Sequence, residues 1–209
     1  TKSGDYPNFF RTIAPDDAQA NLQVRFAVDQ LGLEKFAVIH DKGTYGQGLA
    51  QFAKEYLEAE SGVEVVLFEG ITAGAVDYSA IVNKIEATGA DAVIYGGYHP
   101  EASKLVTQIK DAKLDITFIS DDGVKDDTFI QVAKEYAEGV YASGPIDTSA
   151  SAVAQKAIQD HQEEYGEEPG PFFLNAYAAA QALLNAIEAA ESTEYDDIKD
   201  ALTSEYVET

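Results

Sequence analysis

Four short segments of this sequence, each directly after an apolar run, carry side chains that could bind a small polar molecule. The segments are 40–45, 69–74, 96–99 and 120–123, and they contain tyrosines, glycines, hydroxyl groups and the adjacent carboxylates Asp121 and Asp122. A carboxylate accepts hydrogen bonds from an ammonium group, while tyrosine rings enclose an apolar side chain and tyrosine hydroxyls donate hydrogen bonds. The inventory therefore predicts recognition of a small zwitterion.

Covalent, metal and nucleotide chemistry have little support in the same sequence. It contains no cysteine, and its three histidines, His40, His99 and His161, lack the paired spacing of a metal-binding helix. The glycine-rich turns carry neither a dinucleotide fingerprint nor a phosphate-loop lysine. Ser79 and Ser120 have no histidine partner in a shared loop, and nothing resembles a nucleophile elbow. We therefore predict no catalytic residue, no metal site and no cofactor.

The net charge and the lengths of the apolar runs exclude further classes of partner. The 209 residues include 37 acidic and 14 basic side chains, for a formal net charge of -23. Such a field repels nucleic acid and anionic membrane surfaces, so neither is an expected partner. No apolar run approaches the roughly 20 residues that a membrane-spanning helix needs. The chain starts with Thr-Lys-Ser-Gly and shows no signal peptide, so we expect a processed chain or a fragment.

Strands and helices alternate over the first two thirds of the chain and would position the four loops. Short apolar runs predict strands at 8–13, 35–40, 63–68, 92–95, 116–119 and 139–142. Between them, segments of about ten to fifteen residues have helical apolar spacing, for example Leu49, Phe52, Ala53 and Tyr56. Right-handed crossovers then give an α/β fold with a doubly wound parallel sheet of the flavodoxin-like type, in which ligands bind at the carboxyl ends of the strands.

After Pro145 the pattern changes to helices alone, predicted at 149–165, 172–190 and 195–202. The middle helix is apolar over much of its circumference, so it needs partners on more than one side. We therefore divide the chain into a hinge strand at 1–13, an α/β ligand-binding lobe at 14–146 and a helical segment at 147–209. The exposed apolar faces of that segment would pack on absent chain, or favour a homodimer or a swapped assembly.

Three of the loop motifs resemble segments of a known family. They are His-Asp-Lys-Gly-Thr-Tyr-Gly-Gln-Gly-Leu at 40–49, Gly-Ile-Thr-Ala-Gly at 70–74 and Tyr-Gly-Gly-Tyr-His-Pro-Glu at 95–101. In order and spacing they resemble the leucine/isoleucine/valine-binding proteins, the periplasmic solute receptors of branched-chain amino-acid ABC importers. Phe-Arg-Thr at 10–12 and Asn-Ala-Tyr-Ala-Ala at 175–179 extend the resemblance through nearly the whole chain, which is similar to the second lobe and its adjoining helices.

The resemblance implies a non-enzymatic, periplasmic or extracellular solute receptor whose two lobes close over an amino acid and which works with an ABC-transporter permease. It makes Tyr45 and Tyr98 the aromatic contacts and Asp122 the partner of the ligand ammonium. Asp121 and Gly97, from the same loops, are assigned to the ligand-binding site as well. The family has glutamate where this chain has Asp122, whose side chain is one methylene shorter. Most of the first lobe is absent from the sequence.

Other interpretations of the same residues stay open at this point. Asp121 and Asp122 could form a solvated turn and helix cap, and Tyr45 and Tyr98 could be loop-packing aromatics. Asp41 together with the two aspartates could hold Mg²⁺ in a receiver-type signalling domain, and a receptor sensor lobe is a related alternative. Two further alternatives are an enzyme on a flavodoxin-like scaffold and an engineered or excised lobe with no activity of its own.

Overall fold

The structure, a computed structural model, describes residues 6–204. The chain divides into two compact units. One is continuous, from Pro15 to Gly144, and the other joins the residues up to Ala14 with those from Pro145 onward. The two units are described separately.

The continuous unit is built on one parallel sheet. Its five strands have the order β2-β1-β3-β4-β5. The strands are β1 (Lys35–His40), β2 (Glu64–Gly70), β3 (Ala92–Gly96), β4 (Thr117–Ser120) and β5 (Val140–Ala142). In the centre Val38 lies opposite Ile94, and Ile94 lies opposite Ile119, so β-branched side chains pair across three strands. Every residue of β3 is buried, as expected of a strand covered on both faces. The predicted doubly wound α/β fold is confirmed.

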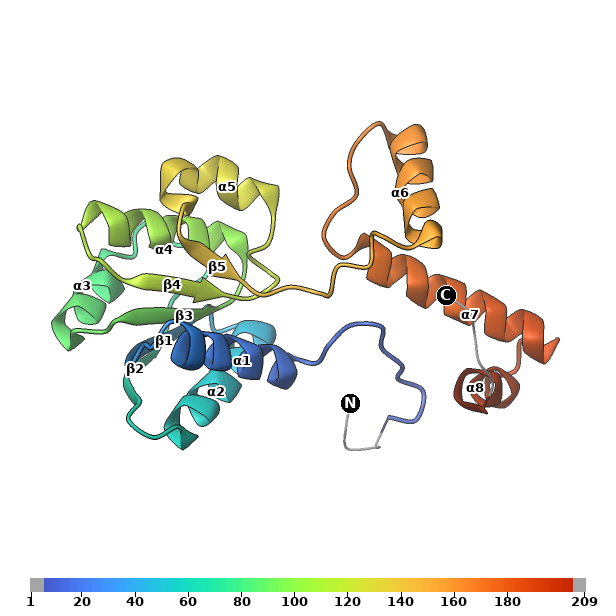
Figure 1. The fold of residues 1–209 in the computed structure, drawn as a ribbon, viewed down its shortest axis with the longest axis horizontal. Helices are drawn as coiled ribbons and strands as arrows, with labels where there is room; N and C mark the ends of the chain where they lie inside the picture. Colours follow the sequence, from blue (N-terminus) through green and yellow to red (C-terminus); the bar gives the residue numbers. More distant parts are fainter. Residues whose placement is uncertain (1–5, 205–209) are drawn as a thin grey trace. The chain divides into compact units, whose positions relative to one another are not determined.

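Helices cover both faces of this sheet (Figure 1). On one face lie α1 (Asp16–Arg25), which continues as a π-helical turn (Phe26–Gln30), and α2 (Thr44–Ala59); on the other lie α3 (Ser79–Thr88), α4 (His99–Asp111) and α5 (Asp127–Ala133). Alternate strand residues point to opposite faces. Val38 accordingly joins the core under α1 and α2, whereas Ile39 joins the core under α3, α4 and α5.

The strand order reverses between β1 and β3, which places a topological switch point at their carboxyl ends. Here the first turn of α2 lies directly against the end of β3. A Cβ atom on Gly46 would be only 2.4 Å from the backbone oxygen of Gly96, closer than a side chain tolerates. The Asp41 amide also donates to Gly96 O at 3.1 Å. These contacts bring the loops after β1 and β3 together.

The second unit contains α6 (Ala152–Tyr165), α7 (Phe173–Ala190) and α8 (Tyr195–Ser204), close to the three helices expected there. The strand predicted at 8–13 is wrong, since these residues contain a turn and a bend but no strand; of the hinge segment predicted at 1–13, residues 1–5 lie outside the described residues. A strand needs a backbone partner, and here the carbonyl of Thr12 instead accepts from the side-chain amide of Asn175 on α7. The Thr12 hydroxyl returns a bond to the carbonyl of Asn175.

The second unit leaves apolar side chains uncovered. Phe9, Phe10, Leu183 and Leu184 are each 45% or more exposed. A hollow of about 640 Å³ lies between residues 8–13 and the helices α7 and α8. In the part of the chain that the structure describes, no helix has both the length and the apolar character needed to cross a membrane.

Candidate ligand-binding site

Tyr45, Tyr98 and Asp122 come together at the carboxyl edge of the sheet. Tyr45 lies in the first turn of α2, Tyr98 is the N-cap residue of α4, and Asp122 follows β4. The Tyr45 hydroxyl donates to Asp122 Oδ1 at 2.5 Å, and the centroids of the two tyrosine rings are 5.4 Å apart. Three segments that are distant in sequence thus form one small cluster of two rings and a carboxylate.

The cluster is open to solvent on one side and surrounded by negative charge. Tyr98 is 50% exposed, so its ring offers apolar surface to a ligand. Among the described residues, Asp122 Oδ2 accepts no hydrogen bond, which leaves it available to an ammonium group. Burial raises the pKa of Tyr45, and the charges of Asp121 and Asp122 and the hydrogen bond to Asp122 raise it further. Tyr45 therefore stays a neutral hydrogen-bond donor at physiological pH.

Asp121 and Gly97, also predicted to bind ligand, lie underneath this cluster. Asp121 is 0% exposed, and its Oδ2 accepts from the Gly97 amide at 2.9 Å while Oδ1 accepts from the Gly123 amide at 3.0 Å. Burial is the main cause that raises the pKa of Asp121, to about 8. Gly97 is buried too, and a Cβ atom there would lie 2.4 Å from the Tyr95 hydroxyl. Both carboxylate oxygens of Asp121 and the amide of Gly97 are thus already used within the protein.

Sequence reasoning missed two residues that support the cluster. Gln19 of α1 has its side-chain oxygen 3.3 Å from the Tyr45 hydroxyl. Tyr95 of β3 is 0% exposed, and within the described chain its hydroxyl has no hydrogen-bond partner. In the sequence Tyr95 belongs to an apolar strand, and Gln19 lies in a helix without a distinguishing motif. Nothing in the spacing of either residue could have identified it.

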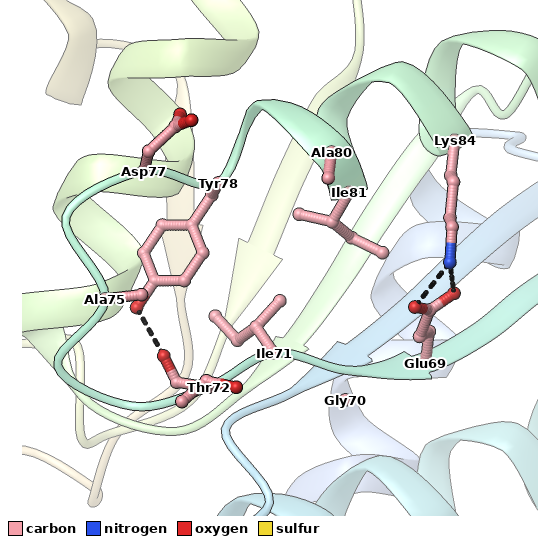
Figure 2. A pocket seen from close by; sticks show the side chains of 10 residues that line it. All are labelled: Glu69, Gly70, Ile71, Thr72, Ala75, Asp77, Tyr78, Ala80, Ile81 and Lys84. Atoms are coloured by element: carbon pink, nitrogen blue, oxygen red, sulfur yellow. Dashed lines mark hydrogen bonds and ion pairs between the residues drawn. The ribbon is translucent and has the colours of Figure 1, made fainter.

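A second hollow, of about 210 Å³, lies between the loop after β2 and the start of α3 (Figure 2). Several of its polar groups already have hydrogen-bond partners. The Tyr78 hydroxyl donates to Thr72 O, and Lys84 bonds both carboxylate oxygens of Glu69. Asp77 accepts from the Ser79 amide and hydroxyl. We therefore place the candidate site at the tyrosine cluster rather than in this hollow, whose charged side chains already have partners.

Metal chemistry gains no support from the described residues, which contain no group of three or more His, Asp or Glu side chains arranged to hold an ion. His40 is buried, and burial lowers its pKa; its Nδ1 accepts from the Lys42 amide. Asp41 is buried as well and caps its own loop by accepting from the Gly43 amide at 2.7 Å. His99, which was expected in a loop, is the first residue of α4.

A parallel sheet of this order, with helices on both faces, is an open α/β fold, and such folds bind ligands at the carboxyl ends of the strands beside the switch point. The chain belongs to the periplasmic binding protein family, whose model matches residues 1–208. It is 37% identical over 198 residues to a Leu/Ile/Val-binding protein homologue of Brucella abortus, covering 93% of this chain and 52% of that protein. The predicted family resemblance is thereby confirmed.

Solved structures agree with this assignment. A leucine-binding protein of Thermotoga maritima has a TM-score of 0.83 and 25% identity, over 93% of this chain and 56% of that one. A branched-chain amino-acid transporter substrate-binding protein of Streptococcus pneumoniae, in complex with isoleucine, has a TM-score of 0.75 and 25% identity, over 91% of this chain and 54% of that one. The chain therefore spans about half the length of the relatives it matches.

Proposed function

We propose that this chain is the part of a solute receptor that recognises the ammonium group and the apolar side chain of a branched-chain or similar aliphatic amino acid. The observation that carries the proposal is the convergence of Tyr45, Tyr98 and Asp122 at the switch point. Relatives of known binding class support it, since the matched structures include a leucine-binding protein and an isoleucine complex. The role is binding and transport, without catalysis.

The chemistry of the cluster fits one end of a zwitterion. Asp122 Oδ2 accepts from the ligand ammonium while Oδ1 keeps its bond to Tyr45, so the carboxylate has a fixed direction before the ligand arrives. The exposed ring of Tyr98 covers part of the aliphatic side chain. The charges that act on Tyr98 come from Asp41, Asp121, Asp122 and Asp16, all carboxylates, which disfavour a ligand carboxylate. We assign the grip on that carboxylate to chain outside this sequence.

The helical unit would pack against the part of the receptor that grips the ligand carboxylate. Its uncovered hollow, lined by Phe9, Phe10, Ala182, Leu183 and Leu202 among others, presents an apolar surface of the kind that is covered in a complete protein. We assign residues 147–209 to packing on the missing first lobe. The whole receptor then acts outside the cytoplasmic membrane, delivers its ligand to an ABC-transporter permease, and has no need of a cofactor. A homodimer through the same apolar surface is the alternative arrangement.

Titration of the chain with leucine, isoleucine and valine tests the proposal, first alone and then with a complementary first lobe, by calorimetry and amide chemical-shift mapping. We expect shifts at Tyr45, Tyr98 and Asp122. Asp122→Asn should weaken binding on the order of tenfold or more, because it removes the charge that pairs with the ammonium. The matched control is Asp126→Asn, since Asp126 caps α5 by accepting from Thr128. If no chemical shift of Tyr45, Tyr98 or Asp122 changes, either in the chain alone or with the complementary lobe, the assignment is refuted.

A further inference from the structure

The loop after β3 and the loop after β4 are joined by one buried side chain. Asp121 lies wholly inside the protein, and each of its carboxylate oxygens accepts a backbone amide proton from a different loop. Gly97 precedes Tyr98, and Gly123 follows Asp122. The two residues that would contact ligand are therefore each bonded, through a neighbouring amide, to the same carboxylate.

The packing around Asp121 shows that these two loops have little freedom. A Cβ atom on Gly123 would lie 2.5 Å from Gly97 O and 3.0 Å from the Tyr98 ring. The His99 amide donates to Gly123 O at 3.0 Å, so the loops also share a direct backbone bond. With no room for a side chain at the contact, a displacement of one loop must be followed by the other.

We propose that Asp121 is a positioning residue that fixes the register between Tyr98 and Asp122, and that its ionised carboxylate is required for full ligand affinity. This inference rests on the proposed function of the cluster. An ionised carboxylate accepts both amides, whereas a protonated one gives up acceptor capacity on one oxygen, which weakens the bond to one loop. The sequence alone predicts that Asp121 contacts the ligand directly. Because Asp121 is buried, we assign it to the layer beneath Tyr98 and Asp122.

Ionisation of Asp121 is opposed by its surroundings. The charge of Asp122, in the same loop, opposes ionisation of Asp121, whereas the hydrogen bond from Tyr45 of α2 favours it. Tyr95 of β3 and Tyr98 at the start of α4 also lie within the field of Asp121; the other carboxylates that act on these tyrosines are Asp41 after β1, Asp16 of α1 and Glu101 of α4. All of them are neutral or negative. Burial in this environment raises the pKa of Asp121 to about 8, so the proton leaves near neutral pH. Leucine affinity should therefore rise as the pH increases through this titration.

The experiment compares wild type with Asp121→Asn, and uses Asp77→Asn as the matched control. Asp77 also accepts hydrogen bonds within a loop that follows a strand, but it lies by the second hollow. Without ligand, the amide shifts of Gly97 and Gly123 should follow one common pH titration, which Asp121→Asn removes. With leucine, Asp121→Asn should weaken binding on the order of tenfold and flatten its pH dependence, while Asp77→Asn leaves both unchanged.

The outcomes separate the two proposals. If leucine shifts no resonance of the cluster even with a complementary lobe, the proposed function fails, and the ligand-free titration still decides whether Asp121 couples the loops. If leucine binds and a folded Asp121→Asn variant keeps wild-type affinity and pH dependence, the positioning role is overturned. Should that variant not fold, the wild-type titration decides, because independent titration of Gly97 and Gly123 contradicts a shared carboxylate.

Discussion

The contact between the start of α2 and the end of β3 makes a sharp prediction about two glycines of one helix. Gly46 and Gly48 both lie in α2, and alanine at either position gains up to about 1 kcal/mol of helix propensity. At Gly48 nothing lies within 4 Å of the added methyl group, so Gly48→Ala should stabilise the α/β unit by roughly that amount. At Gly46 the methyl group would lie 2.4 Å from Gly96 O and 2.5 Å from Asp41 Oδ1.

That overlap involves backbone, which cannot rotate away. Forcing an extra methyl group into such a contact costs about 3 kcal/mol, so Gly46→Ala should destabilise the α/β unit by about 2 kcal/mol after the helical gain. The two variants should therefore differ by about 3 kcal/mol. Urea unfolding followed by the amide resonances of β3 reports this unit by itself, as is needed in a chain with two units. A Gly46→Ala variant as stable as Gly48→Ala would refute the close approach at the switch point.

Three further predictions concern the two units. Burial raises the pKa of Asp121 to about 8, so the folded chain keeps a proton that the unfolded chain loses above about pH 3.9. The resulting stabilisation of the folded state is complete below about pH 3.9 and disappears as the pH rises through about 8. Urea unfolding across this range should show the wild-type free energy of unfolding falling relative to Asp121→Asn by up to about 1.4 kcal/mol per pH unit, and a constant difference would contradict it. Ile94→Ala, at a site that is 0% exposed, should destabilise the α/β unit by about 2–5 kcal/mol in the same assay, and a loss below about 1 kcal/mol would mean that this centre is not packed. Asn175→Ala removes the bond to Thr12 O and should speed amide exchange around Thr12 without changing exchange in β3; unchanged exchange at Thr12 would disprove that contact.

The α/β unit was predictable because its strands have a simple signal. Runs such as Phe36 to Ile39 and Ala92 to Tyr95 are apolar on both faces, which only a covered parallel strand tolerates. The predicted strand at 8–13 failed for a physical reason. Phe9 and Phe10 look like strand residues locally, but a strand also requires an adjacent backbone, and the Thr12 carbonyl is taken by a side chain of α7.

The proximity of the candidate site residues was predictable, while their binding of a ligand stays a prediction. Motifs identified Tyr45, Tyr98 and Asp122, and strand-end topology was sufficient to place them together. Burial within a loop has no comparable sequence signal, so the sequence could assign Asp122 to the ammonium by resemblance but could not show that the adjacent Asp121 is wholly enclosed. The hydrogen-bond partner Gln19 comes from a helix whose position depends on the whole fold.

The most direct test of the account is a crystal structure of the chain with leucine, grown with a complementary first lobe if the chain alone does not retain the ligand. We expect ligand density beside the Tyr98 ring, with the ammonium nitrogen within hydrogen-bond distance of Asp122 Oδ2 and Asp121 still bonded to the Gly97 and Gly123 amides. Leucine bound instead in the hollow beside Tyr78 and Lys84, with the tyrosine cluster empty, would contradict it.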